Sequence, residues 1–350
     1  MTAASQLHVR LIGKANGVGL SRDFELLAAA LRQSGCEVSL LGCERRERKR
    51  RRSLLTRFAA RLRRLGAAHA AAPVCDVNLM LEHTWPQFLH QARCNVLVPN
   101  PEWFDRRDLG FLAAMDRVWV KTAMAEALFA ARGCRCQLIG FDSEDRYLPQ
   151  VPRQGQFLHL AGRSPLKGTQ RLLALWQRHP EWPQLTLVQD APAVGQAARP
   201  AGNIVQQRGY LDDAQLRTLQ NSHRYHLCTS EAEGWGHYIA EALSVQAVAL
   251  VSDAPPMNEL VSAERGLLVG VRAGERHNLV RLALFEDSAL EAAVQRALSL
   301  GEAESAAIGA AGRSWFLHNK RGFAGRLQHA VADLRLALAA AAAPVDAPQP

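Results

Sequence analysis

The chain has 350 residues, of which 48% are hydrophobic and 21% charged, and a formal net charge of +9. This length exceeds a single ordinary core and predicts two domains of the usual size. The composition is that of a globular protein, and its apolar runs are too short to cross a bilayer, which excludes a membrane-spanning class. The first residues lack the basic and long apolar regions of a secretion signal, so we expect a cytoplasmic protein.

The positive charge is concentrated in one segment. Residues 45–64 carry eleven Lys or Arg and one Glu, a net of +10 against +9 for the whole chain, so the remainder is close to neutral. Within residues 45–65, leucines and a phenylalanine recur at helical spacing among arginines. Two interpretations stay open: a helix on an anionic membrane surface at the inner face, or an insertion whose apolar side packs on its own domain. Nucleic-acid binding is disfavoured because no interleaved aromatics accompany the patch.

The seven cysteines are odd in number and scattered. Cys134 and Cys136 lack a second pair at zinc-like spacing, so we expect neither a metal site nor a disulfide framework. We interpret all seven as reduced thiols.

The N-terminal half has the pattern of an α/β domain. A strand at residues 7–12, a glycine loop at 13–20 and a helix at 21–31 open it. The loop, which contains Gly17, either holds phosphate at a helix N-terminus or is a plain tight turn. The remaining elements follow in order: strands at 36–41, 77–81, 95–98, 117–121 and 137–139, with a helix at 123–131, and a linker at 146–152.

Polar residues follow two of these strands. Because ligands bind at the carboxyl ends of strands in an open parallel sheet, His83, Asn100 and Glu102 are candidates for the wall of a binding cleft. A lone histidine in such a place is more often structural than catalytic.

The second half repeats the α/β pattern. A strand at residues 157–160 leads through Gly162, Arg163, Lys167 and Gly168 into a helix at 171–176. Two cations four residues apart between glycines at a helix entry suit a diphosphate, although two solvated surface cations would give the same pattern. The elements beyond are strands at 185–188, 204–205, 226–229, 248–252 and 266–269, helices at 214–219, 288–300 and 303–338, and a frayed tail at 339–350.

Two glutamates mark the loop after the strand at 226–229. Glu233 precedes a helix and Glu241 lies on it, so the two carboxylates can address opposite ends of one extended ligand. Such a span suits the recognition of hydroxyl groups better than hydrolytic acid and base chemistry.

Three motifs of the second half together resemble one enzyme family. They are Gly162-Arg163-x-x-x-Lys167-Gly168, the turn Gly209-Tyr210-Leu211, and Ser230-x-x-Glu233-Gly234-Trp235-Gly236-x-x-x-x-Glu241-Ala242. With these motifs the chain resembles GT-B glycosyltransferases of the retaining family 4 type, also called group 1 glycosyl transferases. The N-terminal half shares with the family its strand, glycine loop and helix.

The resemblance implies a fold and a reaction. The fold is two Rossmann-like domains facing a cleft, with the C-terminal helix crossing back: residues 1–150 on the acceptor side, 151–338 for the nucleotide sugar, and 339–350 as a disordered tail. The reaction is retaining transfer of a sugar from a UDP-, GDP- or other nucleotide sugar to a hydroxyl acceptor, such as a surface glycan or lipid-linked glycan. We expect no cofactor and no metal, because the sequence contains no Asp-x-Asp pair.

The resemblance also implies roles for single residues. Glu233 would contact the donor sugar, Glu241 the ribose, and Arg163 with Lys167 the diphosphate. Gly234, Trp235 and Gly236 would allow close backbone approach, and Tyr210 with Leu211 would lie beside the base. Many members carry a histidine near the reacting sugar where this chain has residues 98–102, so the acceptor side is left to His83, Asn100 and Glu102.

Other functions fit the same sequence. A nucleotide-sugar epimerase or a phosphorylase would share the fold. A non-catalytic subunit that binds a nucleotide sugar or serves as a scaffold would keep the same site without turnover.

Overall fold

The computed structural model describes residues 6–14, 19–43, 73–189, 202–209 and 211–342. The basic segment 45–65, Gly17 and Tyr210 lie outside these residues, so their predicted roles stay predictions. The chain forms two compact units, residues 1–141 with 321–350 (unit 1) and residues 142–320 (unit 2). The domain boundary predicted between residues 150 and 151 stays a prediction.

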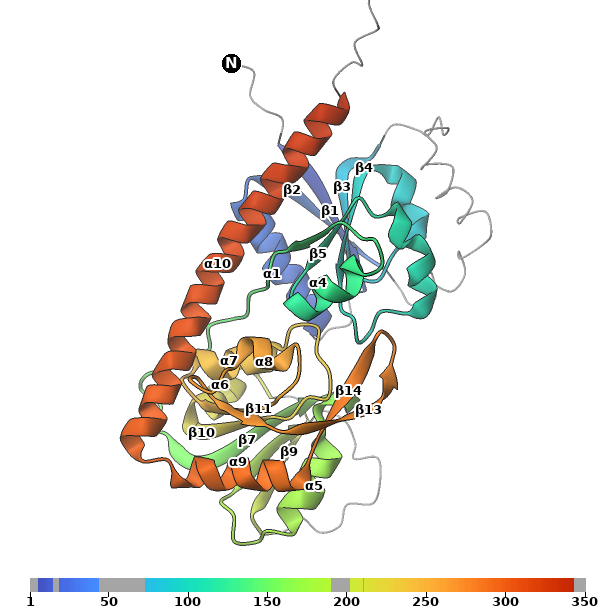
Figure 1. The fold of residues 1–350 in the computed structure, drawn as a ribbon. Helices are drawn as coiled ribbons and strands as arrows, with labels where there is room; N and C mark the ends of the chain where they lie inside the picture. Colours follow the sequence, from blue (N-terminus) through green and yellow to red (C-terminus); the bar gives the residue numbers. More distant parts are fainter. Residues whose placement is uncertain (1–5, 15–18, 44–72, 190–201, 210, 343–350) are drawn as a thin grey trace, which may run out of the picture. The chain divides into compact units, whose positions relative to one another are not determined.

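Unit 1 contains a parallel sheet with the strand order β2-β1-β3-β4-β5-β6 (Figure 1). Its strands β3 and β4 are almost continuously buried, as expected for parallel strands covered on both faces. The strands are β1 Leu7–Gly13, β2 Cys36–Gly42, β3 Cys75–Glu82, β4 Ala92–Pro99, β5 Arg117–Val120 and β6 Cys136–Leu138, and the helices are α1 Gly19–Gln33, η1 Pro86–Gln91, η2 Arg106–Ala114 and α4 Ala123–Ala130.

Unit 2 contains a second parallel sheet with the order β12-β11-β10-β7-β8-β9. Its core gathers around Phe157, Trp176 and Tyr225, with Leu250 and Phe285 packed into the same cluster. The strands are β7 Gln154–Gly162, β8 Leu185–Gln189, β9 Ile204–Arg208, β10 His223–Cys228, β11 Val248–Ser252 and β12 Leu267–Val269. The helices are η3 Pro165–Lys167, α5 Thr169–Gln177, α6 Asp213–Ser222, α7 His237–Ser244, α8 Met257–Leu260 and α9 Asp287–Ser299.

A hairpin that the sequence pattern did not predict follows β12. Its strands are β13 Val271–His277 and β14 Val280–Phe285, which pair antiparallel. Leu282 of β14 packs with Leu166 and Ala232, and the Ala283 backbone N–H donates to the Glu231 carbonyl at 2.8 Å. The hairpin therefore supports the loop that carries Glu233.

The C-terminal helix α10, Glu302–Ala342, is continuous over 41 residues (Figure 1). Its residues up to Lys320 belong to unit 2 and those from Arg321 to unit 1, so the predicted return of the chain to the first unit is confirmed. In unit 1, Phe323 packs on Phe141, and Arg326 Nε donates to the Ile139 carbonyl at 2.8 Å. The helix ends at Ala342 rather than Leu338, and residues 343–350 lie outside the described part.

Within the described part of the chain, no helix combines the length and the apolar character that a membrane span requires. All seven cysteines are free thiols, and Cys228 is fully enclosed, so burial raises its pKa strongly.

Candidate functional site

In the parallel sheet of unit 2, the order in which successive strands are added reverses between the neighbouring strands β7 and β10. Strands β8 and β9 follow β7 on one side, whereas β11 and β12 follow β10 on the other. In open α/β sheets, ligands bind at the carboxyl ends of strands where the order reverses. β7 ends at Gly162 and β10 at Cys228, so the two motif loops, residues 162–168 and 229–236, both start at this point.

Glycines bring these two loops into contact. Gly168 has a φ of +67°, and a Cβ there would lie 2.8 Å from the Thr229 carbonyl oxygen. The Thr229 hydroxyl donates to the Lys167 carbonyl at 2.9 Å, and the Glu231 N–H donates to the Leu166 carbonyl at 2.8 Å. The loops therefore form one assembly in which Gly168 fills a place that a side chain would block.

Lys167 and Glu233 meet within this assembly. Lys167 Nζ donates to Glu233 Oε1, and the two side chains are only 14% and 15% exposed. Ser230 Oγ donates to the same carboxylate oxygen at 2.5 Å and lies 2.5 Å from the Tyr238 hydroxyl. Lys167 Nζ also lies 3.4 Å from the centroid of the Tyr238 ring, a cation–π contact.

The surroundings keep Tyr238 neutral. Burial and the negative groups nearby, Glu233 among them, raise the pKa of the Tyr238 hydroxyl well above its usual value. The Lys167 ammonium and the Glu233 carboxylate thus lie side by side, in contact with the side chains of Ser230 and Tyr238. Such a pair can bind an anion and a hydroxyl group of one ligand.

The other predicted residues of unit 2 lie in the loops that precede its helices. Arg163 is exposed directly after Gly162, whose φ is +56°. Gly234, Trp235 and Gly236 are buried at the entry to α7, and Leu211 is half-buried just before α6.

Glu241 belongs to a separate polar network on the inner side of α7. It is 3% exposed, and its Oε2 accepts a hydrogen bond of 2.8 Å from Gln220 Nε2. Gln220 in turn accepts from Arg146 Nε at 2.9 Å. Arg146, the first residue of the predicted linker 146–152, has its side chain buried in unit 2, where four hydrogen-bond acceptors surround its guanidinium. The linker itself stays a prediction.

In unit 1, the polar residues after β3 and β4 share one edge of the sheet, since Glu82 pairs with Pro99 in register. His83 Nδ1 lies 3.1 Å from Asp108 Oδ2, and Thr84 Oγ1 donates to Asp108 Oδ1 at 3.0 Å. Asp108 is fully buried. A carboxylate beside Nδ1 favours the tautomer with the proton there, and Nε2 lies 3.6 Å from Glu82 Oε1.

Backbone strain marks the same edge. Glu82 has a φ of +63°, which is unusual for a residue other than glycine. Residues held in such strained conformations cluster at functional sites. Of the remaining acceptor-side candidates, Glu102 is buried and Asn100 is half-buried. Asn100 Oδ1 is buried without a hydrogen-bond partner among the described residues.

Solved structures match the chain over nearly its full length. Sucrose-phosphate synthase from Thermosynechococcus elongatus matches with a TM-score of 0.69 and 16% identity, over 95% of this chain and 100% of that chain. A glycosyltransferase from Rickettsia africae matches with 0.67 and 11%, over 95% and 99%. HepE from Anabaena, solved with UDP and glucose, matches with 0.65 and 14%, over 95% and 100%.

The chain has the GT-B fold. At these identities the likeness establishes the fold alone. No protein-family model matches the sequence, and no curated protein matches it.

Within this GT-B fold the sequence-predicted residues fall into separate groups. Lys167 and Glu233 are brought together, whereas Glu241 lies in the network of Gln220. His83, Asn100 and Glu102 belong to unit 1.

Sequence reasoning missed several polar partners, namely Asp108, Arg146, Gln220 and Tyr238. A signal existed for Gln220, which lies four residues after Leu216 and so on the inward face of α6.

Proposed function

We propose that the chain is a glycosyltransferase of the retaining family 4 type, which moves a sugar from a nucleoside diphosphate sugar to a hydroxyl group. The observation that carries the proposal is the enclosed Lys167–Glu233 pair at the reversal point of the second sheet. The three sequence motifs support it. Two of the structures with the same fold support it as well, since one is a sucrose-phosphate synthase and another was solved with UDP and glucose.

The proposed chemistry assigns each charged group to one part of the donor. When the bond between the anomeric carbon and the diphosphate oxygen breaks, negative charge develops on the leaving phosphate. Lys167 and Arg163 stabilise that charge, and Glu233 accepts hydrogen bonds from the sugar hydroxyls. The new bond forms between the acceptor oxygen and the anomeric carbon on the face that the phosphate leaves, with no covalent intermediate, so the configuration is retained.

The nucleoside is assigned to the other end of the site. Glu241 binds the ribose hydroxyls, Tyr210 and Leu211 lie beside the base, and Gly234 to Gly236 allow the backbone to approach the donor. The reaction is proposed to proceed without a cofactor or a bound metal.

On the acceptor side, His83 is proposed as the base that takes the hydroxyl proton through Nε2, with Asp108 holding its ring. A carboxylate behind a histidine fixes the orientation and the tautomer of its ring. The acceptor is proposed to be a glycan or a lipid-linked glycan, with the basic segment 45–65 on an anionic membrane surface. Asn100 and Glu102 stay further acceptor-side candidates.

Product analysis with labelled nucleotide sugars tests this function. The purified protein is mixed with UDP- or GDP-sugars, with and without a lipid-linked or glycan acceptor fraction. We expect label in the acceptor, retained anomeric configuration by NMR, and loss of transfer in Lys167→Ala and Glu233→Ala. The surface variant Glu291→Ala is the control, because Glu291 of α9 pairs with Arg178 and His179, which follow α5.

Each rival gives a different result. A nucleotide-sugar epimerase changes the donor without any acceptor, and a phosphorylase requires phosphate. A binding or scaffold subunit turns over no donor, and its biological activity survives both substitutions. Any of these results contradicts the proposed function.

A further inference from the structure

Arg146 is a buried cation whose guanidinium donates hydrogen bonds to Asp213, Glu144 and Gln220. Its side chain is 3% exposed, and its Nη1 donates to Asp213 Oδ1 at 2.5 Å and to Glu144 Oε2 at 2.9 Å. Nη2 donates to the Asp213 carbonyl at 3.2 Å, and Nε donates to Gln220 Oε1 at 2.9 Å. Burial alone would lower the pKa of Arg146, but the bond to Asp213 and the charge of Glu241 outweigh it and raise that pKa.

The guanidinium of Arg146 fixes the orientation of the next side chain. A guanidinium can only donate, so the amide oxygen of Gln220 must face it. The amide nitrogen of Gln220 must then face the other way, where it donates to Glu241 Oε2 at 2.8 Å. Gln220 is fully buried, which leaves its amide no access to solvent. Arg146, Gln220 and Glu241 thus form a hydrogen-bonded chain with one direction.

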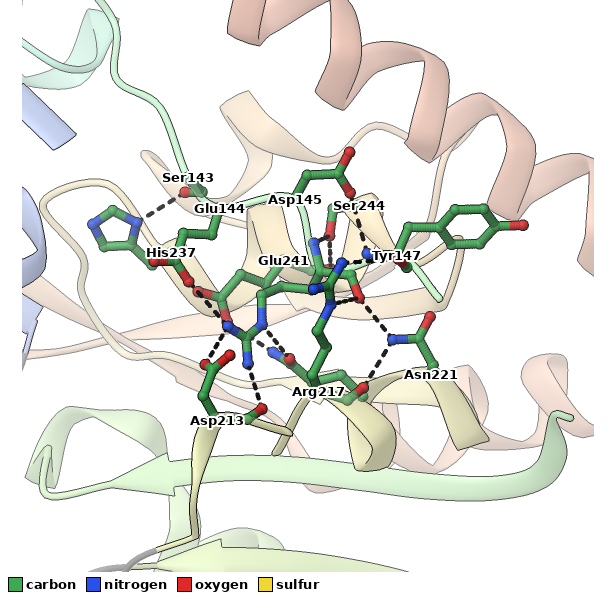
Figure 2. Close-up of polar contacts among 12 residues, drawn as sticks. Ser143, Glu144, Asp145, Tyr147, Asp213, Arg217, Asn221, His237, Glu241 and Ser244 are labelled. Carbon is green, nitrogen blue, oxygen red and sulfur yellow. Dashed lines mark hydrogen bonds and ion pairs between the residues drawn. The ribbon is translucent and has the colours of Figure 1, made fainter. Parts of the chain in front are cut away.

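The same segment holds both ends of α7 (Figure 2). Ser143 Oγ lies 2.8 Å from His237 Nδ1 and accepts from Trp235 Nε1 at 3.1 Å. The Arg146 backbone N–H donates to Ser244 Oγ at 3.1 Å. Residues 143–146 therefore link the loop that carries Glu233 to the helix that carries Glu241.

Stability alone does not explain a buried polar chain of this kind. Apolar side chains of similar volume often replace buried charged groups without loss of stability, and sometimes with a gain. Here the polar chain ends on the carboxylate that is assigned to the donor ribose. A carboxylate has about four lone-pair sites, so a carboxylate that is held by a hydrogen bond from Gln220 can also accept hydrogen bonds from ligand hydroxyls.

We infer that Arg146, acting through Gln220, is a positioning residue that orients Glu241 toward the ribose hydroxyls of the donor. The inference rests on the proposed function and deepens it, because it explains how the nucleoside end of the site distinguishes ribose from deoxyribose. A side chain that is already oriented before the ligand binds loses less conformational entropy on binding, which strengthens the affinity.

Calorimetric titration of the full chain tests the inference. UDP, GDP and ADP are each compared with the 2′-deoxy form, for the wild type, Gln220→Met and Arg146→Met. We expect the wild type to bind one ribonucleotide about 10-fold more tightly than its deoxy form. In Gln220→Met that ratio falls to about 1 while the affinity for the deoxy form is kept, and in Arg146→Met it falls in the same direction.

Arg313→Met is the matched control. Arg313 bonds to Asp145 and to the Ser244 carbonyl, so it braces the same segment without touching Gln220. A purely structural role of the segment would change the ratio in all three variants, whereas the inference predicts that Arg313→Met keeps it. If Gln220→Met does not fold, Gln220→Glu keeps the bond to Arg146, turns a donor toward Glu241 into an acceptor, and must abolish the ratio as well.

The outcomes separate the two proposals. A wild type that distinguishes the sugars, with Gln220 and Arg146 variants that keep the ratio, overturns this inference and leaves the proposed function in place. A wild type that binds a nucleotide without distinguishing the sugars overturns the ribose assignment and the inference together. A wild type that binds none of the nucleotides contradicts the proposed function itself.

Discussion

Lys167 and Glu233 are 66 residues apart in the sequence and meet as an enclosed ion pair in unit 2. Each follows a strand that ends at the reversal point of the sheet, which is why spacing and residue type could indicate them before the structure. Their partners Ser230 and Tyr238 lie within the motif that spans residues 230–242. Asp108 could not be found this way, because only the fold brings its carboxylate to His83, 25 residues earlier.

Gly168→Ala tests the close approach of the two motif loops. The added Cβ would lie 2.8 Å from the Thr229 carbonyl oxygen at a φ of +67°. We expect a loss of stability of about 2–4 kcal/mol in urea unfolding, together with weaker nucleotide binding. Gly133→Ala is the control, since its φ is +74° but nothing lies within 4 Å of the new Cβ. Equal losses for the two variants would contradict the role given to loop contact.

Asp108→Asn tests the acceptor-side base. The Thr84 hydroxyl donates to Oδ1, so the new amide would turn its nitrogen toward His83 Nδ1 and move the ring proton to Nε2. We expect kcat to fall about 10²-fold or more with donor affinity unchanged. Asp116→Asn serves as the comparison, because the Asp116 carboxylate accepts the backbone N–H of Asn95 at 2.7 Å. An unchanged kcat in Asp108→Asn would remove His83 from the mechanism.

At the scale of the elements, buried histidines join the central strands of unit 2. His159 of β7 lies 2.8 Å from the Leu227 carbonyl of β10 and 3.0 Å from Thr169 Oγ1 of α5. Burial lowers the pKa of His159 to about 4 and that of His226 to about 3. Both imidazoles are therefore neutral in the folded protein at pH 7.

These two histidines predict an acid-sensitive fold. In the unfolded chain these histidines bind protons below about pH 6.5, whereas in the folded protein they stay neutral down to about pH 4. Between these two pH values, protonation therefore favours the unfolded state. The free energy of unfolding should fall by roughly 1 kcal/mol per pH unit for each histidine below pH 6.5. Urea unfolding from pH 7 to pH 4.5 measures this slope. His226→Gln should make the slope shallower, and an unaltered slope would contradict the assignment.

The strands and helices were mostly predictable, and the exceptions have physical reasons. Short apolar runs marked β3, β4 and β11, because these parallel strands are buried along almost their whole length. The β13–β14 hairpin was missed because charged residues interrupt its apolar alternation and its turn is not a glycine turn. The network of Arg146 was missed because a charged residue before two prolines has the composition of a linker.

At the scale of the whole molecule, α10 completes the core of unit 1. Leu327 and Leu334 of this helix are 0% and 1% exposed, and Arg335 Nη2 donates to the Gly35 carbonyl at 2.9 Å. The sequence indicated a long C-terminal helix. The packing of its residues from Arg321 onward in unit 1 depends on contacts such as that between Arg335 and Gly35, 300 positions earlier, which local pattern cannot reveal.

Leu327→Ala tests this contribution. Removing a fully buried leucine should lower the free energy of unfolding by about 2–5 kcal/mol. Leu336→Ala is the matched control on the same helix, because Leu336 is 70% exposed and its loss should cost less than about 0.5 kcal/mol. Urea unfolding compares the two variants. Similar values for both would mean that α10 does not pack as described.

Residues 142–320 are proposed to bind a nucleoside diphosphate sugar, and a thermal-shift screen against UDP, GDP, ADP and their sugar derivatives tests this binding. A ligand at 100 times its Kd stabilises the folded state by about 2.7 kcal/mol, which raises the melting temperature by a few degrees. We predict such a shift for at least one ligand, its loss in Lys167→Met, and its retention in Lys320→Met, where the lysine pairs with Asp142. No shift with any ligand, or an equal shift in Lys167→Met, would contradict the account.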